Sequence, residues 1–305
     1  LAALYALAQG DAPVVVATAD GLMARTLPPE TLRSLAITLE VGGQAELGAL
    51  AEQLLSAGYT RCEQVEGVGQ FALRGGILDV FSPLMDQPVR CEFFDDEIDS
   101  MGAFDPGTQR RTRNVSSARI LPAAEGLPHC APGGLPGLAD QLTALAEKLA
   151  KKQKTEAIVQ TLREDAERLR SGAAPGAADR YLAAIYPTVT AGVHYLPPDA
   201  VVFLSESGRV DQRVKNTVLQ QKQDVEALLS AGVLAGEYAH LTLTAEELYA
   251  ALEDFPVILE DSLPTSRHPL RPRGLLTMNA KQLSSYGGSL ETAVTDLEHY
   301  RSSGS

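Results

Sequence analysis

The sequence predicts an α/β fold in which a small β-rich domain interrupts an α/β core. Three observations lead to this prediction: apolar runs near both ends of the chain, a series of short β-like runs between residues 58 and 122, and leucines at helical spacing after residue 127. The composition, 45% hydrophobic and 21% charged, is that of an ordinary globular protein. A chain of 305 residues is long enough for more than one domain with its own core.

Residues 1–56 are predicted to form a partial α/β domain. The apolar run 14–17 is typical of a buried strand. A helix is predicted just before Gly58, because leucines recur there at helical spacing: Leu47, Leu50, Leu54 and Leu55. The chain does not begin with Met, so we expect a fragment of a longer protein whose first domain lacks its N-terminal part.

Residues 57–125 are predicted to form a separate antiparallel β domain. Its β-like runs follow one another closely: Gln70–Arg74, Ile77–Phe81, Val89–Phe94 and Glu97–Met101. Turn residues separate these runs, among them Gly75-Gly76 and Asp95-Asp96. Closely spaced strands with such turns indicate a meander of neighbouring strands.

Residues 126–180 are predicted to be a helical connector with two amphipathic helices. Apolar residues recur there at spacings of three and four: Leu135, Leu138, Leu142, Leu145 and Leu149, then Val159, Leu162, Ala166 and Leu169. The glycines and Pro175 of residues 172–176 end this segment as a loop.

Residues 181–305 return to α/β character. The runs Val201–Leu204 and Val257–Leu259 are apolar at every position, which is typical of central strands covered on both faces. Helices over 210–231 and 244–253 are predicted to cover them. We expect this segment and residues 1–56 to belong to one core, and the C-terminus to be truncated.

Charge and cysteine usage narrow the class of function. The formal net charge is −13, and nucleic-acid affinity comes mainly from Lys and Arg that displace counterions from phosphates. The one local basic cluster is Arg110, Arg111, Arg113 and Arg119, beside Asp105. A protein partner is therefore favoured over DNA. The isolated Cys62, Cys91 and Cys130 favour a reducing cytoplasm over a disulfide framework or a zinc site.

One part of the predicted β domain carries a specific pattern. It comprises three segments, Gly69–Phe81, Pro88–Ser100 and Phe104–Arg110. This pattern is similar to the signature shared by UvrB and the bacterial transcription-repair coupling factor (Mfd) family. The segment GQFALRGGILDVF and the Gln109-Arg110 ending resemble the coupling factors more than UvrB.

The resemblance implies that this β domain docks UvrA, the damage-recognition ATPase of nucleotide excision repair. The docking residues of the family match Arg74, Arg90 and Phe94 here. Arg and Phe are typical anchors of protein interfaces. In a strand, Arg90 and Phe94 would face away from Val89, Cys91 and Phe93, which are the better core candidates. The alternative is that both arginines form solvated ion pairs with Glu92 or Asp79 and contribute little.

The resemblance also implies a degenerate helicase-type (P-loop-like) core. Helicase-type ATPases need a GxxxxGK[ST] loop and an acidic pair that positions Mg²⁺, and the sequence has no GK[ST]. The nearest match to the acidic motif has Ser205 in place of the Mg²⁺-holding Asp, keeps Glu206, and has Gly208 in place of a His. A hydroxyl does not supply the charge of a carboxylate beside Mg²⁺. We therefore expect no catalysis, no cofactor and no metal in this chain.

The leading hypothesis is a UvrA-docking module of a coupling factor that acts at RNA polymerase stalled by DNA damage. The resemblance places ATP-driven translocation, polymerase binding and duplex DNA binding in domains outside this chain. Two alternatives stay open: a UvrB-type damage-loading ATPase, and an autoinhibitory module that masks the docking face. Binding of UvrA by the isolated chain would discriminate among them.

Overall fold

The computed structural model describes residues 1–12, 14–263, 267–278 and 290–303, and divides into two compact units. The first is Leu1–Leu270 and contains all the sheets of the described residues. In the second, Arg271–Ser305, the described residues include the helix α10 (Leu290–Ser303). The mixed α/β composition predicted from the sequence is confirmed.

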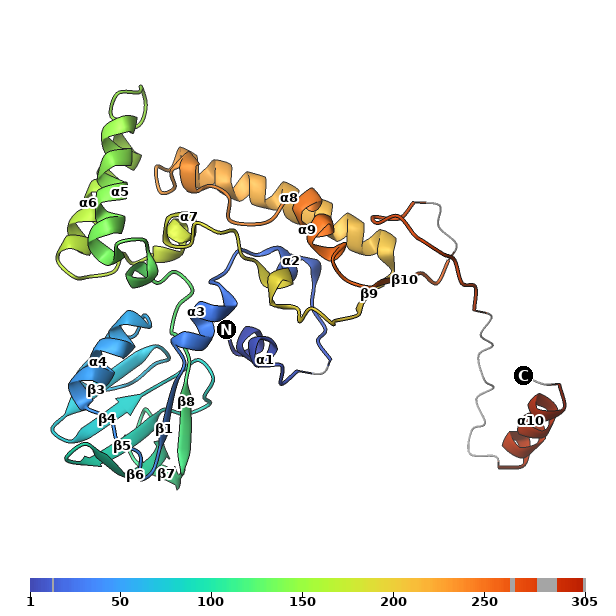
Figure 1. The fold of residues 1–305 in the computed structure, drawn as a ribbon, viewed down its shortest axis with the longest axis horizontal. Coiled ribbons are helices and arrows are strands. Elements are labelled where there is room, and N and C mark those ends of the chain that lie inside the picture. The colour runs from blue at the N-terminus through green and yellow to red at the C-terminus, as the bar shows by residue number, and fades with distance from the viewer. Residues whose placement is uncertain (13, 264–266, 279–289, 304–305) are drawn as a thin grey trace. The chain divides into compact units, whose positions relative to one another are not determined.

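The largest sheet has six strands in the order β2-β3-β4-β5-β6-β7 (Figure 1). Its strands are β2 (Thr60–Arg61), β3 (Gln70–Arg74), β4 (Ile77–Val80), β5 (Val89–Phe94), β6 (Glu97–Phe104) and β7 (Arg111–Asn114). β2 is parallel to β3, and every later pair is antiparallel. The predicted meander is therefore confirmed, with β6 running further than expected.

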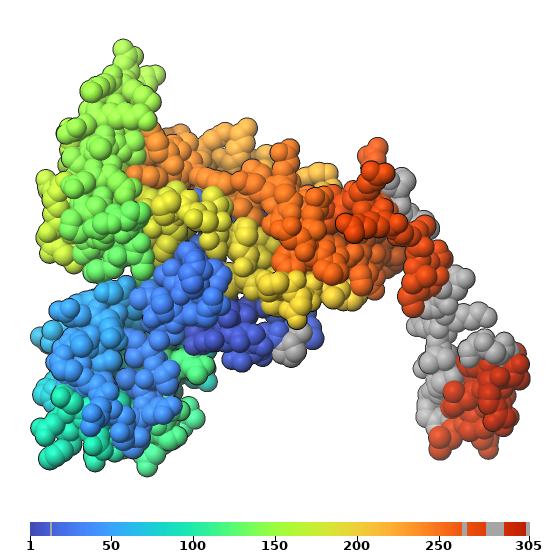
Figure 2. All heavy atoms as spheres, in the orientation of Figure 1, coloured from blue at the N-terminus to red at the C-terminus, as the bar shows by residue number. Residues whose placement is uncertain are grey.

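The helix predicted before Gly58 is confirmed as α4 (Leu47–Ser56), and it covers one face of this sheet. Leu50 and Leu54 pack in one core with Phe71 and Leu78. The side chain of Glu46 caps α4 by accepting hydrogen bonds from two of its first backbone N–H groups, at 2.8 and 2.7 Å. This helix and the sheet make up much of the blue and teal surface in Figure 2.

A second, two-stranded sheet joins β1 (Ile37–Glu40) to β8 (Ser117–Ile120) in antiparallel register. Leu39 and Ile120 contribute to the core under α4, so the β domain packs with residues that precede residue 57. The boundaries drawn from the sequence at residues 56, 125 and 180 stay predictions.

The two helices predicted for the connector are confirmed as α5 (Gly134–Leu149) and α6 (Glu156–Arg170), and they pack against each other. The leucines at helical spacing lie in their shared core. Asp165 is buried on α6 and accepts hydrogen bonds from Arg180 and from the Tyr181 hydroxyl. This network attaches the helix pair to the segment that follows it.

The C-terminal α/β part contains the parallel pair β9 (Val202–Ser205) and β10 (Val257–Glu260) with the helices α8 (Ser207–Ser230) and α9 (Ala245–Leu252). Both predicted strands are confirmed, but not their cover on both faces. Leu204 packs into the core with α8 and α9, whereas Phe203 and Ile258, paired on the other face, are 63% and 46% exposed.

The expected strand at residues 14–17 is wrong. These residues form no strand, and Val14 and Val16 are 82% and 95% exposed. An apolar run becomes a strand only if a neighbouring strand satisfies its backbone groups, and no described strand pairs with this run. The nearby elements are α1 (Ala2–Gln9), α2 (Ala19–Met23) and α3 (Pro29–Ser34).

The segment after α2 lies against the C-terminal α/β part. Ala24 and Arg25 form isolated bridges to Thr242 and Ala191. The buried Arg25 side chain donates to the Tyr186 carbonyl at 2.6 Å. The remaining short helices are η1 (Pro128–Cys130), η2 (Ala178–Tyr181), α7 (Leu182–Ile185), η3 (Gly192–Tyr195) and η4 (Gly236–Tyr238).

Candidate partner-docking face

The face of the large sheet opposite α4 holds the three residues that the resemblance assigns to docking. On β5, Val89 and Cys91 are 5% and 0% exposed and Phe93 packs beside them in the core under α4. Alternation along the strand therefore turns Arg90 and Phe94 to the opposite face. This arrangement of β5 is the one predicted from the sequence.

Asp79, on β4, is the centre of this face. Its side chain is fully buried, and it lies opposite Arg90 in the register of β4 and β5. Asp79 Oδ1 accepts from Arg90 Nε at 2.7 Å and Oδ2 accepts from Arg90 Nη2 at 2.8 Å. Oδ2 also accepts from Arg74 Nη2 at 2.7 Å. One buried carboxylate thus holds two guanidinium groups from different strands.

Several contacts hold the Arg90 guanidinium in place. Its guanidinium lies 4.7 Å from the centre of the Phe104 ring and also donates to the backbone and side chain of Gln109, at 3.5 and 3.4 Å. The hydrogen bond to Asp79 raises the pKa of Arg90, outweighing the opposite effect of burial. With 20% of its side chain exposed, Arg90 presents an oriented cation at the surface.

Phe94 is exposed at the end of β5. Its exposed fraction is 76%, the next residue, Asp95, adopts a φ of 51°, and the chain turns there into β6. A large aromatic ring that is exposed to solvent on the same face as two arginines is typical of the residues that anchor protein interfaces. Arg74 is also accessible, with 46% of its side chain exposed.

The structure refines the alternative in which both arginines form solvated ion pairs. Both arginines do pair with Asp79, but that carboxylate is buried. The ion pairs therefore also neutralise a charge inside the domain. Glu92 instead accepts from Ser100 at 2.8 Å and lies 3.8 Å from Arg111. Sequence reasoning missed the contacts of Arg90 with Phe104 and Gln109, which depend on strand register and not on local spacing.

The residues that the resemblance assigns to a degenerate acidic motif lie at the end of β9 and the start of α8, outside this face. Ser205 is exposed, and Glu206 precedes α8 with a φ of 55°. Ser207, the first residue of α8, donates its backbone N–H to Asp261 at 2.8 Å and its hydroxyl to both oxygens of that carboxylate. The N-terminus of a helix is where a phosphate would bind, and here a carboxylate of the protein occupies it.

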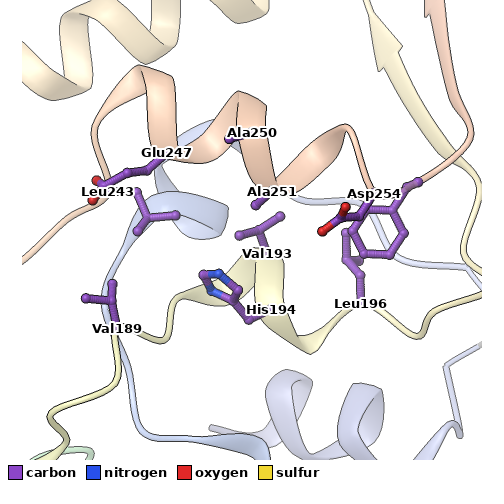
Figure 3. Close-up of a pocket in the computed structure, with 10 residues that line it drawn as sticks. Val189, Val193, His194, Leu196, Leu243, Glu247, Ala250, Ala251 and Asp254 are labelled. Carbon is purple, nitrogen blue, oxygen red and sulfur yellow. The ribbon is translucent and has the colours of Figure 1, made fainter.

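A hollow of about 530 Å³ lies between η3 and α9 (Figure 3). Its walls are mostly apolar, with His194, Glu247 and Asp254 around it, and none of its described lining residues is Lys or Arg. Burial raises the pKa of Glu247, but hydrogen bonds from Thr244 and His240 bring it below its ordinary value. A hollow with two carboxylates at its edge would repel a nucleotide phosphate.

Two further features are absent from the residues that the structure describes. No group of three or more His, Cys, Asp or Glu side chains within them is arranged to hold a metal ion. Over the same residues, no helix has the length and apolar character needed to cross a membrane.

Comparison with known proteins places the face within a described family of domains. Residues 37–125 match the family model described as the UvrB interaction domain. Over 300 residues the chain is 26% identical to the transcription-repair-coupling factor of Bacillus subtilis, covering 97% of this chain and 25% of that protein.

Two further relatives carry the same name. The coupling factor of Myxococcus xanthus is 38% identical over 175 residues, 56% of this chain and 14% of the relative. That of Staphylococcus aureus strain USA300 is 25% identical over 301 residues, 97% of this chain and 25% of the relative. The chain therefore spans at most about a quarter of the length of these relatives.

Proposed function

Because this chain is a relative of the transcription-repair-coupling factors and carries a UvrB interaction domain, we propose that it docks UvrA through Arg74, Arg90 and Phe94. In the complete protein this contact would bring nucleotide excision repair to RNA polymerase stalled at DNA damage. The observation that carries the proposal is an exposed Phe94 on the same face as two arginines oriented by one buried carboxylate.

The α/β part supports a non-catalytic role. We propose that it is a degenerate helicase-type core split by the β domain, and that it binds no nucleotide and no metal. The packing of residues 19–26 with β9 and α8 supports the split core. Ser205 in place of a carboxylate, and Asp261 at the N-terminus of α8, support the absence of nucleotide binding.

The remaining activities belong to the complete protein in this proposal. RNA polymerase, duplex DNA and the ATP-driven motor would engage domains outside this chain, in the bacterial cytoplasm. Another part of the complete protein would mask the docking face until the protein is activated. The charge of −13 supports weak DNA binding by this chain. Arg111 and Arg113 lie on β7, whereas Arg119 lies on β8 with its guanidinium 5.6 Å from the centre of the Tyr5 ring.

The test is the affinity of the isolated chain for UvrA. Phe94→Ala is expected to weaken binding about thirtyfold, the effect of losing an anchor worth about 2 kcal/mol. Phe94 is exposed, so the variant should unfold at the same urea concentration as the parent. Val68→Ala, an exposed apolar residue outside the strands of the sheet, is the matched control. Parent-like binding by Phe94→Ala would place the docking face elsewhere.

A second measurement separates the docking module from a UvrB-type ATPase. Calorimetric titration with Mg-ATP is expected to give no saturable heat, and steady-state hydrolysis should equal the buffer blank. A micromolar ATP site would favour the ATPase alternative.

A further inference from the structure

We propose that the docking face extends across β6 to Arg111, and that it fits a partner surface on which acidic side chains surround an apolar recess. This inference rests on the proposed function, because the partner in question is UvrA. It adds a residue from β7 to the docking residues on β3 and β5, and it specifies the chemistry of the opposing surface.

Arg111 reaches this face because β6 has a glycine where the Arg111 side chain crosses it. Gly102 lies opposite Arg90 on one side and Asn114 on the other. A Cβ built on Gly102 would lie 2.2 Å from Arg111 Nε and 2.8 Å from its Cζ. The absence of a side chain at Gly102 therefore lets the Arg111 guanidinium approach the strand closely.

Polar neighbours hold the guanidinium in this position. Arg111 Nη2 donates to Ser100 Oγ at 3.1 Å and lies 3.8 Å from Glu92 Oε1. Arg111 Nη1 donates to Asn114 Oδ1 at 3.4 Å. The side chain keeps 33% of its surface exposed, so it is oriented but still accessible to a partner.

The charges of the face favour an acidic partner. Arg74, Arg90 and Arg111 contribute three positive charges, and only Asp79 and Glu92, among the described residues, pair with them. Asp79 is fully buried, so a partner would meet the cations more than this carboxylate. On a chain of net charge −13, three surface arginines that outnumber the two carboxylates pairing with them are a distinct feature. Phe94, exposed at the end of β5, requires an apolar recess among the acidic groups.

A bulge in the β6–β7 pair separates Arg111 from Arg113. The register shifts between Ala103 and Phe104, so that Arg111 lies opposite Phe104 whereas Arg113 lies opposite Ala103. Phe104 contacts the Arg90 guanidinium, and Ala103 pairs with Val89, which belongs to the core under α4. The two arginines of β7 thus lie on opposite faces, which makes Arg113 a matched control.

The experiment measures UvrA affinity of the full chain at two salt concentrations, with circular dichroism confirming the fold. Arg111→Ala is expected to weaken binding about fivefold and Arg111→Glu about thirtyfold, with a shallower salt dependence for the alanine variant. Arg113→Ala should bind like the parent. Equal affinities for Arg111→Ala and Arg113→Ala, with Phe94→Ala still impaired, would overturn the extension to Arg111 and leave UvrA docking intact. A parent chain that does not bind UvrA would instead refute the proposed function itself.

Discussion

Asp79 and Asp261 are both aspartates, but they have different roles in two parts of this chain. Asp79 lies within a strand, fully buried, and is neutralised by two guanidinium groups. Asp261 follows β10, is 16% exposed, and accepts hydrogen bonds from neutral groups of Ser207. In the first region a buried carboxylate orients two arginines at the surface. In the second a carboxylate caps a helix and brings negative charge to the place where a phosphate would bind.

The difference lies in the kind of group that each region attracts. A face that orients arginines and exposes Phe94 favours association with an acidic protein surface. At the start of α8, after a strand that ends in Ser205, the Asp261 carboxylate already accepts the backbone N–H that an anion would bind.

The largest effect is expected from Asp79→Asn. The change keeps the shape of the side chain but removes the charge that both arginines neutralise, and breaking a buried ion pair from one side costs about 3 kcal/mol. Urea unfolding of the chain measures it. Glu92→Gln is the control, because 46% of that side chain is exposed and its loss should cost less than about 0.5 kcal/mol. If the Asp79→Asn variant were as stable as the parent, the charge of Asp79 would not contribute to the stability of the domain.

A smaller effect, divided unequally, is expected for the arginines. Arg90→Ala removes two hydrogen bonds to Asp79 and the contact with Phe104, and should cost about 2 kcal/mol. Arg74→Ala removes one hydrogen bond from a side chain that is 46% exposed, and should cost about 1 kcal/mol. Denaturant midpoints of the two variants give the order. The reverse order would show that Arg74, not Arg90, is the principal partner of Asp79.

Much of this fold was predictable because its elements have strong local patterns. The leucines of α4, α5 and α6 and the alternation of β5 each predict their element from neighbouring residues alone. The position of Phe94 followed from the same alternation. These features require no knowledge of what lies across the sheet.

The remainder depends on contacts between residues far apart in the sequence. The prediction of a strand at residues 14–17 was wrong because a local sequence pattern does not reveal whether a pairing strand is present. Asp261 caps α8 from 54 residues away. The Arg111 side chain crosses Gly102 on another strand, and a bulge places Arg111 opposite Phe104 and Arg113 opposite Ala103, although they are only two residues apart in the sequence.

Asp261→Ala is expected to have a moderate effect. It removes the acceptor at the start of α8, and loss of such a cap costs about 1 kcal/mol. Thermal or urea unfolding measures the change, and Asp199→Ala, an exposed acidic residue outside the helices and strands, serves as control. If Asp261→Ala also created a binding site for phosphate or ATP, the carboxylate alone would have been excluding the anion.

The smallest effect is expected from Ser205→Asp, which restores the carboxylate that helicase-type ATPases use beside Mg²⁺. Ser205 is exposed and lies opposite Glu260 in the parallel register, so the added charge should cost about 0.5 kcal/mol through repulsion between like charges. ATP binding and hydrolysis should stay at the level of the parent. The chain has no GxxxxGK[ST] loop, and Asp261 still occupies the N-terminus of α8. Ser205→Asn separates the effect of size from that of charge. A saturable Mg-ATP site in the Ser205→Asp variant alone would show that the missing carboxylate at position 205 had disabled the site. The difference in anion binding between the two regions would then depend on Ser205 and not on Asp261.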